Sequence, residues 1–264
     1  MIPESVPLLL LLALSQAVFL GVSASLAIGL LRLANRTGEQ PERLLGLHFG
    51  LCLFLGYILL VTGVAAVQRP GTLSPGWMMF CIGGGQVLSA AGVFANVVFT
   101  WRVFRPGERW AAAFAAALGV AMVVGIALFG VGGGFERGRF EGFGFWMYYG
   151  AMMLAAVWVA AEAFRYRTLM RRREAIGLGD PLLSNRFLLW GIGSLARFGM
   201  LLCGVAEPIV QPMPAEPRAI LTVLVLTTAS TLGLVLAASY WLAFLPTQGY
   251  VRWVTGDEAG IVAD

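Results

Sequence analysis

Long apolar stretches alternate with short polar segments along the chain. Seven stretches reach or exceed the roughly 20 residues that an α-helix needs to cross a bilayer. They cover residues 6–31, 44–67, 76–101, 110–132, 143–165, 187–209 and 218–244. The segments between them contain Gly, Pro and charged residues, which are typical of loops and turns. The pattern predicts an all-α integral membrane protein: a bundle of seven transmembrane helices over residues 1–246, followed by a short tail over 247–264.

The composition indicates lipid rather than water as the solvent. Hydrophobic residues make up 59% and charged residues 12% of the 264 residues, and the mean hydropathy is +0.81. Soluble domains are only about half apolar and about a quarter charged. All 18 basic residues are Arg, so the Lys that a retinal Schiff base requires is missing. The single His48 excludes a bis-His haem and a three-His zinc site. We therefore expect no cofactor and no metal.

Arg is distributed unequally between the two sides of the predicted bundle. Alternate connecting segments place 13 Arg on one side and 4 on the other, and Arg197 lies inside a span. Positively charged loops remain on the cytoplasmic side of a membrane. We therefore expect a multi-pass protein of the plasma (inner) membrane, with the N-terminus outside and the C-terminus in the cytoplasm. Because the Arg residues mark the loops, the net charge of +4 indicates topology and not nucleic-acid binding.

Several polar residues fall near the middle of the predicted spans. Arg197 lies about ten residues from either end of the sixth span, where a charge costs several kcal/mol unless it faces the bundle interior. Five other polar side chains lie at nearly the same depth: Gln16, Tyr57, Gln86, Tyr149 and Thr227. The six residues are candidates for ligand binding in a polar pocket at the membrane midplane. Interhelical hydrogen bonding around a structural Arg is the alternative.

The third span carries a face of small and polar residues. Gly85, Ser89, Gly92 and Asn96 recur at positions i, i+4, i+7 and i+11, which lie on one side of a helix. Small residues let helix backbones approach closely in membranes. The spacing therefore predicts that this helix packs tightly at the centre of the bundle. His48, alone near one end of the second span, is interpreted as a packing histidine; a proton relay with Glu162 is the alternative.

The densest basic cluster follows the fifth span, in the connection over residues 165–186. It consists of Arg165, Arg167, Arg171, Arg172 and Arg173. Each Arg near an anionic membrane surface contributes about 1 kcal/mol of attraction. We expect the cluster to contact anionic lipids at the cytoplasmic face, and docking of a protein partner is the alternative.

Seven spans with the N-terminus outside are similar in architecture to rhodopsin-like receptors and to the seven-helix sensor modules of bacterial signalling proteins. The similarity is topological only, because the third span ends in Phe99-Thr100-Trp101-Arg102 and no receptor motif is matched. The sequence also has no HExxH motif or carboxylate cluster, so we expect no enzyme.

The connections are too short for a catalytic domain, so any output must pass through a partner. We interpret the chain as a membrane-embedded receptor- or sensor-like module for signal transduction that acts through a separate cytoplasmic or membrane protein. The alternatives are an accessory or structural subunit of a larger membrane complex, and a transporter of small solutes or lipids.

Overall fold

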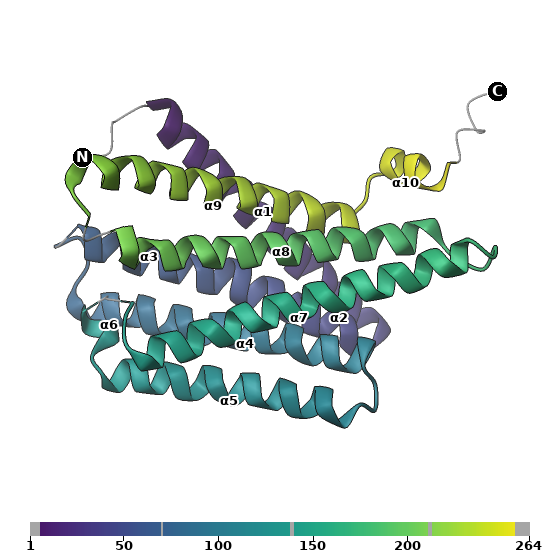
Figure 1. The fold of residues 1–264 in the computed structure, drawn as a ribbon, viewed down its shortest axis with the longest axis horizontal. Helices are drawn as coiled ribbons and strands as arrows, with labels where there is room; N and C mark the ends of the chain where they lie inside the picture. Colours follow the sequence, from purple (N-terminus) through teal and green to yellow (C-terminus); the bar gives the residue numbers. More distant parts are fainter. Residues whose placement is uncertain (1–5, 70, 138–139, 211–212, 257–264) are drawn as a thin grey trace. The chain divides into compact units, whose positions relative to one another are not determined.

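The computed structural model describes residues 6–69, 71–137, 140–210 and 213–256. Regular secondary structure in these stretches is entirely helical, and helices hold 88% of the chain (Figure 1). Seven helical segments are long and apolar enough to cross a membrane. The predicted all-α class and the presence of seven span-length helices are therefore confirmed, and they indicate a multi-pass membrane protein.

The seven long segments follow one another through short connections. They are α1 (Val6–Thr37), the continuous run of α2 (Gln40–Leu47), η1 (His48–Gly56) and α3 (Tyr57–Gln68), then α4 (Pro75–Phe104), α5 (Arg109–Val131), α7 (Phe143–Glu174), α8 (Pro181–Val210) and α9 (Ala215–Phe244). Two short helices, α6 (Gly134–Arg137) and α10 (Gln248–Thr255), complete the described part of the chain. Each predicted apolar stretch lies inside one long segment, except that the fourth stretch ends one residue after α5 does.

The connection between α7 and α8 is shorter than the sequence predicts. α7 continues to Glu174 and α8 begins at Pro181, so most of the expected connection over 165–186 is helical. The helix outlasts the apolar stretch because Arg, Leu and Met are good helix formers. The chain then turns at Gly177, whose φ is +74°, and the Asp180 carboxylate accepts a hydrogen bond of 2.8 Å from the Leu182 backbone N–H. The basic cluster therefore lies mainly on a helix.

The predicted tail begins with the short helix α10. The hydroxyl oxygen of Thr247 accepts a hydrogen bond from the Tyr250 backbone N–H at its start, and Gly256 ends it with a φ of +73°. The Asn185 side-chain amide donates a hydrogen bond of 2.6 Å to the Tyr250 hydroxyl. This bond joins α10 to the N-terminal part of α8.

The chain divides into two compact units. One unit consists of residues 1–22, 156–207 and 214–264, and the other of residues 23–155 and 208–213. We call them the α8–α9 unit and the α4 unit, after the helices that each contains. Because α1 and α7 are long, each contributes residues to both units.

In the α4 unit, the small face of α4 packs directly against the second long segment. A side-chain carbon at Gly92 would lie 2.6 Å from the Cys52 backbone nitrogen, and one at Gly56 would lie 2.6 Å from the Ser89 hydroxyl oxygen. A side-chain carbon at Gly85 would lie 2.8 Å from the Leu60 side chain. Half of the most apolar stretch of α4 is buried. Among the seven candidate spans of the described chain, only α7 has a larger buried share. The predicted tight packing of the third span is confirmed.

His48 lies at this same contact, at the start of the π-helical turn η1. Its side chain is 1% exposed, and Nδ1 lies 3.0 Å from the Gly92 carbonyl oxygen. A carbonyl only accepts, so Nδ1 must carry the proton that is donated. His48 therefore joins η1 to α4, which agrees with its interpretation as a packing histidine.

Aromatic rings close the α4 unit where α5, α6 and α7 meet. Phe129 stacks on Phe140 with ring centroids 6.2 Å apart, and it also contacts Phe135 and Phe145 at 5.4 and 6.0 Å. Tyr149 stacks on Phe145 at 5.0 Å. Phe135 and Phe140, which come from a part of the sequence rich in Gly and charged residues, therefore pack onto a hydrophobic cluster.

In the α8–α9 unit, glycines let three helices approach closely. A side-chain carbon at Gly191 would lie 2.7 Å from the Phe164 ring of α7, and one at Gly193 would lie 2.7 Å from the Tyr240 ring of α9. Gly199 faces Leu232 in the same way. As residue numbers rise along α8 they fall along α9, so these two helices run antiparallel and side by side (Figure 1).

Candidate functional site

Arg197 is a buried charge in the middle of α8. Its side chain is only 6% exposed, and it lies between the Gly193–Tyr240 and Gly199–Leu232 contacts that join α8 to α9. Residues 190, 193, 194 and 197 share one helical face, because they are spaced at i, i+3, i+4 and i+7. Arg197 also makes at least one polar or ring contact within the structure. The Arg197 side chain therefore leaves α8 on the face that packs against α9.

A polar and aromatic group lies next to Arg197, on the side toward the start of α8. The hydroxyl oxygens of Ser194 and Tyr240 are 3.2 Å apart, and both residues are buried. Trp190 packs edge-on against Phe244 at 5.5 Å, and Tyr240 contacts the same ring. Sequence analysis did not select Ser194 or Tyr240. Ser194 could have been recognised by its spacing, one helical turn before Arg197.

The six residues predicted for ligand binding divide equally between the two units. Arg197, Thr227 and Gln16 belong to the α8–α9 unit, where Arg197 is buried and the other two are half-buried. Gln86, Tyr57 and Tyr149 belong to the α4 unit, where Gln86 is buried and the two tyrosines are half-buried.

The surroundings of these residues differ in kind. Tyr149 takes part in the aromatic cluster around Phe129 and Phe145. The Thr227 carbonyl accepts a hydrogen bond of 2.9 Å from the Thr231 hydroxyl, a contact within one helix. Gln86 is 2% exposed, and its side-chain oxygen has no hydrogen-bond partner among the described residues. Gln86 is therefore the predicted residue with the clearest unused hydrogen-bonding capacity.

Glu162 is held by its own helix. Its carboxylate is buried and accepts a hydrogen bond of 3.2 Å from Arg165, one turn further along α7. The Arg165 side chain is about half exposed, at 47%. Arg165 thus neutralises a buried carboxylate, and it differs in this respect from the other four members of the basic cluster.

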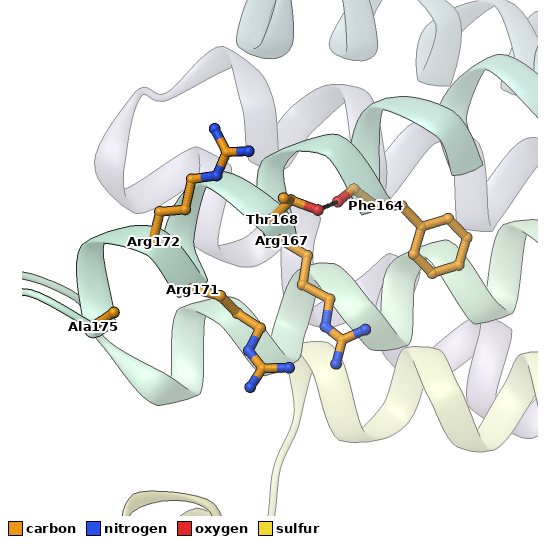
Figure 2. A pocket seen from close by; sticks show the side chains of 6 residues that line it. All are labelled: Phe164, Arg167, Thr168, Arg171, Arg172 and Ala175. Carbon is orange, nitrogen blue, oxygen red and sulfur yellow. Dashed lines mark hydrogen bonds between the residues drawn. The ribbon is translucent and has the colours of Figure 1, made fainter.

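The basic end of α7 carries an open hollow of about 430 Å³. It is lined by Phe164, Arg167, Thr168, Arg171, Arg172 and Ala175, which are spaced three and four residues apart and so follow one side of the helix. Figure 2 shows the guanidinium groups of Arg167 and Arg171 extending in the same direction, while Arg172 extends to the other side in this view. The Thr168 hydroxyl donates a hydrogen bond of 3.0 Å to the Phe164 carbonyl.

Three of the five predicted cluster residues therefore line one cavity. Arg165 and Arg173 are not among its lining residues. Charge density alone marks all five residues and does not separate the three that line the hollow from the two that do not. The spacing of Phe164, Arg167, Thr168 and Arg171 along a helix is the signal that separates them.

Metal-binding chemistry has no cluster to support it in the residues that the structure describes. Nowhere in these stretches do three or more His, Cys, Asp or Glu side chains gather as potential ligands. Comparisons of the chain with protein-family models, curated proteins and solved structures found no match.

Proposed function

We propose that the chain is a membrane-embedded receptor or sensor module of the plasma (inner) membrane. In this proposal the N-terminus is outside, the C-terminus is cytoplasmic, and a small anionic or strongly hydrogen-bonding ligand binds near Arg197. The signal passes to a separate protein partner at the Arg-rich inner face. The 13 to 4 distribution of Arg supports this orientation.

The buried position of Arg197 is the observation that carries the proposal. A guanidinium within a span costs several kcal/mol unless it is paired or hydrated, and such residues commonly mark binding sites or pathways. Along α8 the nearest carboxylate is Glu207, ten residues away and so about 15 Å along the axis. A guanidinium carries five N–H donors, so an anionic ligand can accept further hydrogen bonds beside the contacts that Arg197 makes within the structure.

The packing of α8 supports a route from such a site to the inner face. Arg197 and Phe187 lie on the same helix, and the Phe187 ring contacts Tyr166 on α7 with centroids 5.6 Å apart. Gly191 is packed tightly against Phe164, at the edge of the basic hollow. Because close-packed helices move as rigid elements, a shift of α8 at Arg197 would displace the basic end of α7. A partner protein bound at the basic end of α7 would respond to such a shift.

Replacing Arg197 by Met separates binding from a structural role. Met keeps an apolar stem and removes the charge. We would measure the melting temperature of the purified protein with a panel of small carboxylates, amino acids and inorganic phosphate. A ligand at a hundred times its Kd stabilises a protein by about 2.7 kcal/mol. We expect at least one of these probes to stabilise the wild type and to have no effect on Arg197→Met.

Arg186→Met is the matched control, because Arg186 is an exposed Arg on the same helix. This variant should retain the stabilisation by the same probe. If Arg197→Met instead lowers the melting temperature equally with and without every probe, Arg197 has a structural role and the proposal is wrong.

A further inference from the structure

The geometry of α7 points to a second binding site, distinct from Arg197. We propose that the hollow between Phe164 and Ala175 binds the phosphate of an anionic lipid headgroup in the inner leaflet. The proposal depends on the orientation of the spans, but it is independent of any ligand at Arg197. It assigns to Arg167 and Arg171 a specific task that the general attraction of a basic cluster to a membrane does not include.

The spacing of the two Arg residues suits a phosphate. Residues four apart on a helix have neighbouring side chains, with Cβ atoms about 5 to 6 Å apart. Arg167 and Arg171 have this spacing, and their guanidinium groups extend in the same direction (Figure 2). A guanidinium binds phosphate oxygens in a two-pronged arrangement, with shorter and stronger hydrogen bonds than neutral groups make. Together the two residues form a clamp for one phosphate.

The position of the hollow selects an amphiphile over a free anion. At one end is Phe164, a half-buried ring that packs against Gly191 of α8 and closes the apolar stretch of α7. Toward the other end are the guanidinium groups of Arg167 and Arg171. A lipid presents the same order, with acyl chains followed by a phosphate. Inorganic phosphate has no apolar part and so would make no contact with the apolar end of the hollow.

The helix end favours cationic side chains at this place. The last turns of a helix carry a partial negative charge from their free carbonyl groups, and Arg side chains there are stabilising. The hollow lies over the final three turns of α7, which ends at Glu174. The negative field of the helix end cannot hold an anion by itself, so binding must come from the Arg side chains. Removing them should therefore abolish the site without unfolding the helix.

The chain itself offers a matched control for charge. Arg173 is exposed on the same helix but is outside the hollow, and Arg186 is exposed at the start of α8. The double substitutions R167Q/R171Q and R173Q/R186Q each remove two positive charges from the basic face. A general attraction to anionic membranes predicts equal effects for the two double variants. A site predicts that only the first is strongly impaired.

We would measure lipid binding by native mass spectrometry of the purified protein in detergent, with phosphatidylglycerol and with phosphatidylcholine. We expect the wild type to retain phosphatidylglycerol selectively. R167Q/R171Q should weaken this binding about tenfold more than R173Q/R186Q does, since charge-assisted bonds to the phosphate are lost. R171K, which keeps the charge and loses the two-pronged geometry, should fall between the wild type and the double variant.

Unchanged melting temperatures in phosphatidylcholine would show that all variants are folded. Competition with glycerol 3-phosphate and inorganic phosphate distinguishes the sources of the anion. If either displaces phosphatidylglycerol at a concentration close to that of the lipid, the site takes a free anion and the lipid assignment is wrong. Equal losses of phosphatidylglycerol binding in both double variants would show that general electrostatic attraction accounts for the binding and that the hollow is not a specific site. Undiminished lipid binding in R167Q/R171Q would leave the hollow to a protein partner and would also overturn the proposal.

Discussion

A side-chain carbon at Gly92 would lie 2.6 Å from the backbone nitrogen of Cys52, so α4 and η1 meet there backbone to backbone. The hydrogen bond between His48 and the Gly92 carbonyl lies at the same contact. No other residue type fits at position 92 unless a helix moves, because the obstacle is main chain and cannot rotate away. This contact holds the second and third predicted spans together.

Gly92→Ala should therefore destabilise the protein. Overpacking a close contact typically costs about 1 to 3 kcal/mol, which outweighs the gain of up to about 1 kcal/mol from the better helix propensity of Ala. Gly150→Ala is the control, since a side-chain carbon at Gly150 meets no other atom within 4 Å. Thermal unfolding in detergent should show a lower melting temperature for Gly92→Ala only, and a larger loss for Gly92→Leu. Equal melting temperatures for the two Ala variants would mean that this face of α4 is not closely packed.

The aromatic cluster predicts different effects of truncating a buried and an exposed Phe. Phe129 is 4% exposed and contacts three other rings, whereas Phe143 is 76% exposed. Truncating a buried Phe costs about 3 to 5 kcal/mol. Phe129→Ala should accordingly lower the free energy of unfolding by about that amount, as measured by denaturation in mixed micelles. Phe143→Ala should change it little, and a comparable loss from both variants would contradict the observed packing.

Cysteine labelling tests the proposed orientation. Glu141 and Leu178 are exposed in connections that the proposal places on opposite sides of the membrane. In a background without the three native cysteines, Glu141→Cys should react with a membrane-impermeant maleimide in intact cells. Leu178→Cys should react only after the cells are permeabilised. The reverse pattern would invert the topology and remove the cytoplasmic assignment of the basic hollow.

Hydropathy and spacing were sufficient to predict the long helices and the close contact of α4. The bilayer imposes a minimum apolar length, so each span is visible in the sequence without its partners. The small face of α4 was also predictable, because Gly85, Ser89 and Gly92 repeat at helical spacing. Both features are local in sequence, which is why they could be inferred without knowing the tertiary contacts.

Other features depend on information that the pattern does not contain. Apolar length shows where lipid contact ends and not where backbone hydrogen bonding ends, so the extension of α7 to Glu174 was missed. The ring contacts of Phe129 with Phe140 are nonlocal and required the fold. Depth along a span supplies one coordinate only. Depth predicts similar levels in the membrane for Arg197 and Gln86. It does not give the direction of either side chain around its helix axis, nor the unit to which each residue belongs.

A density map of the purified protein in a lipid nanodisc tests the proposed receptor function most directly. If Arg197 binds a ligand, the map should show a hydrated cavity there, with density that is not protein within hydrogen-bonding distance of the guanidinium, about 3 Å. This density should disappear in Arg197→Met while the helices remain in place. A dry interior in which protein groups accept every hydrogen bond from Arg197 would contradict the account, and so would a guanidinium that reaches the lipid headgroups.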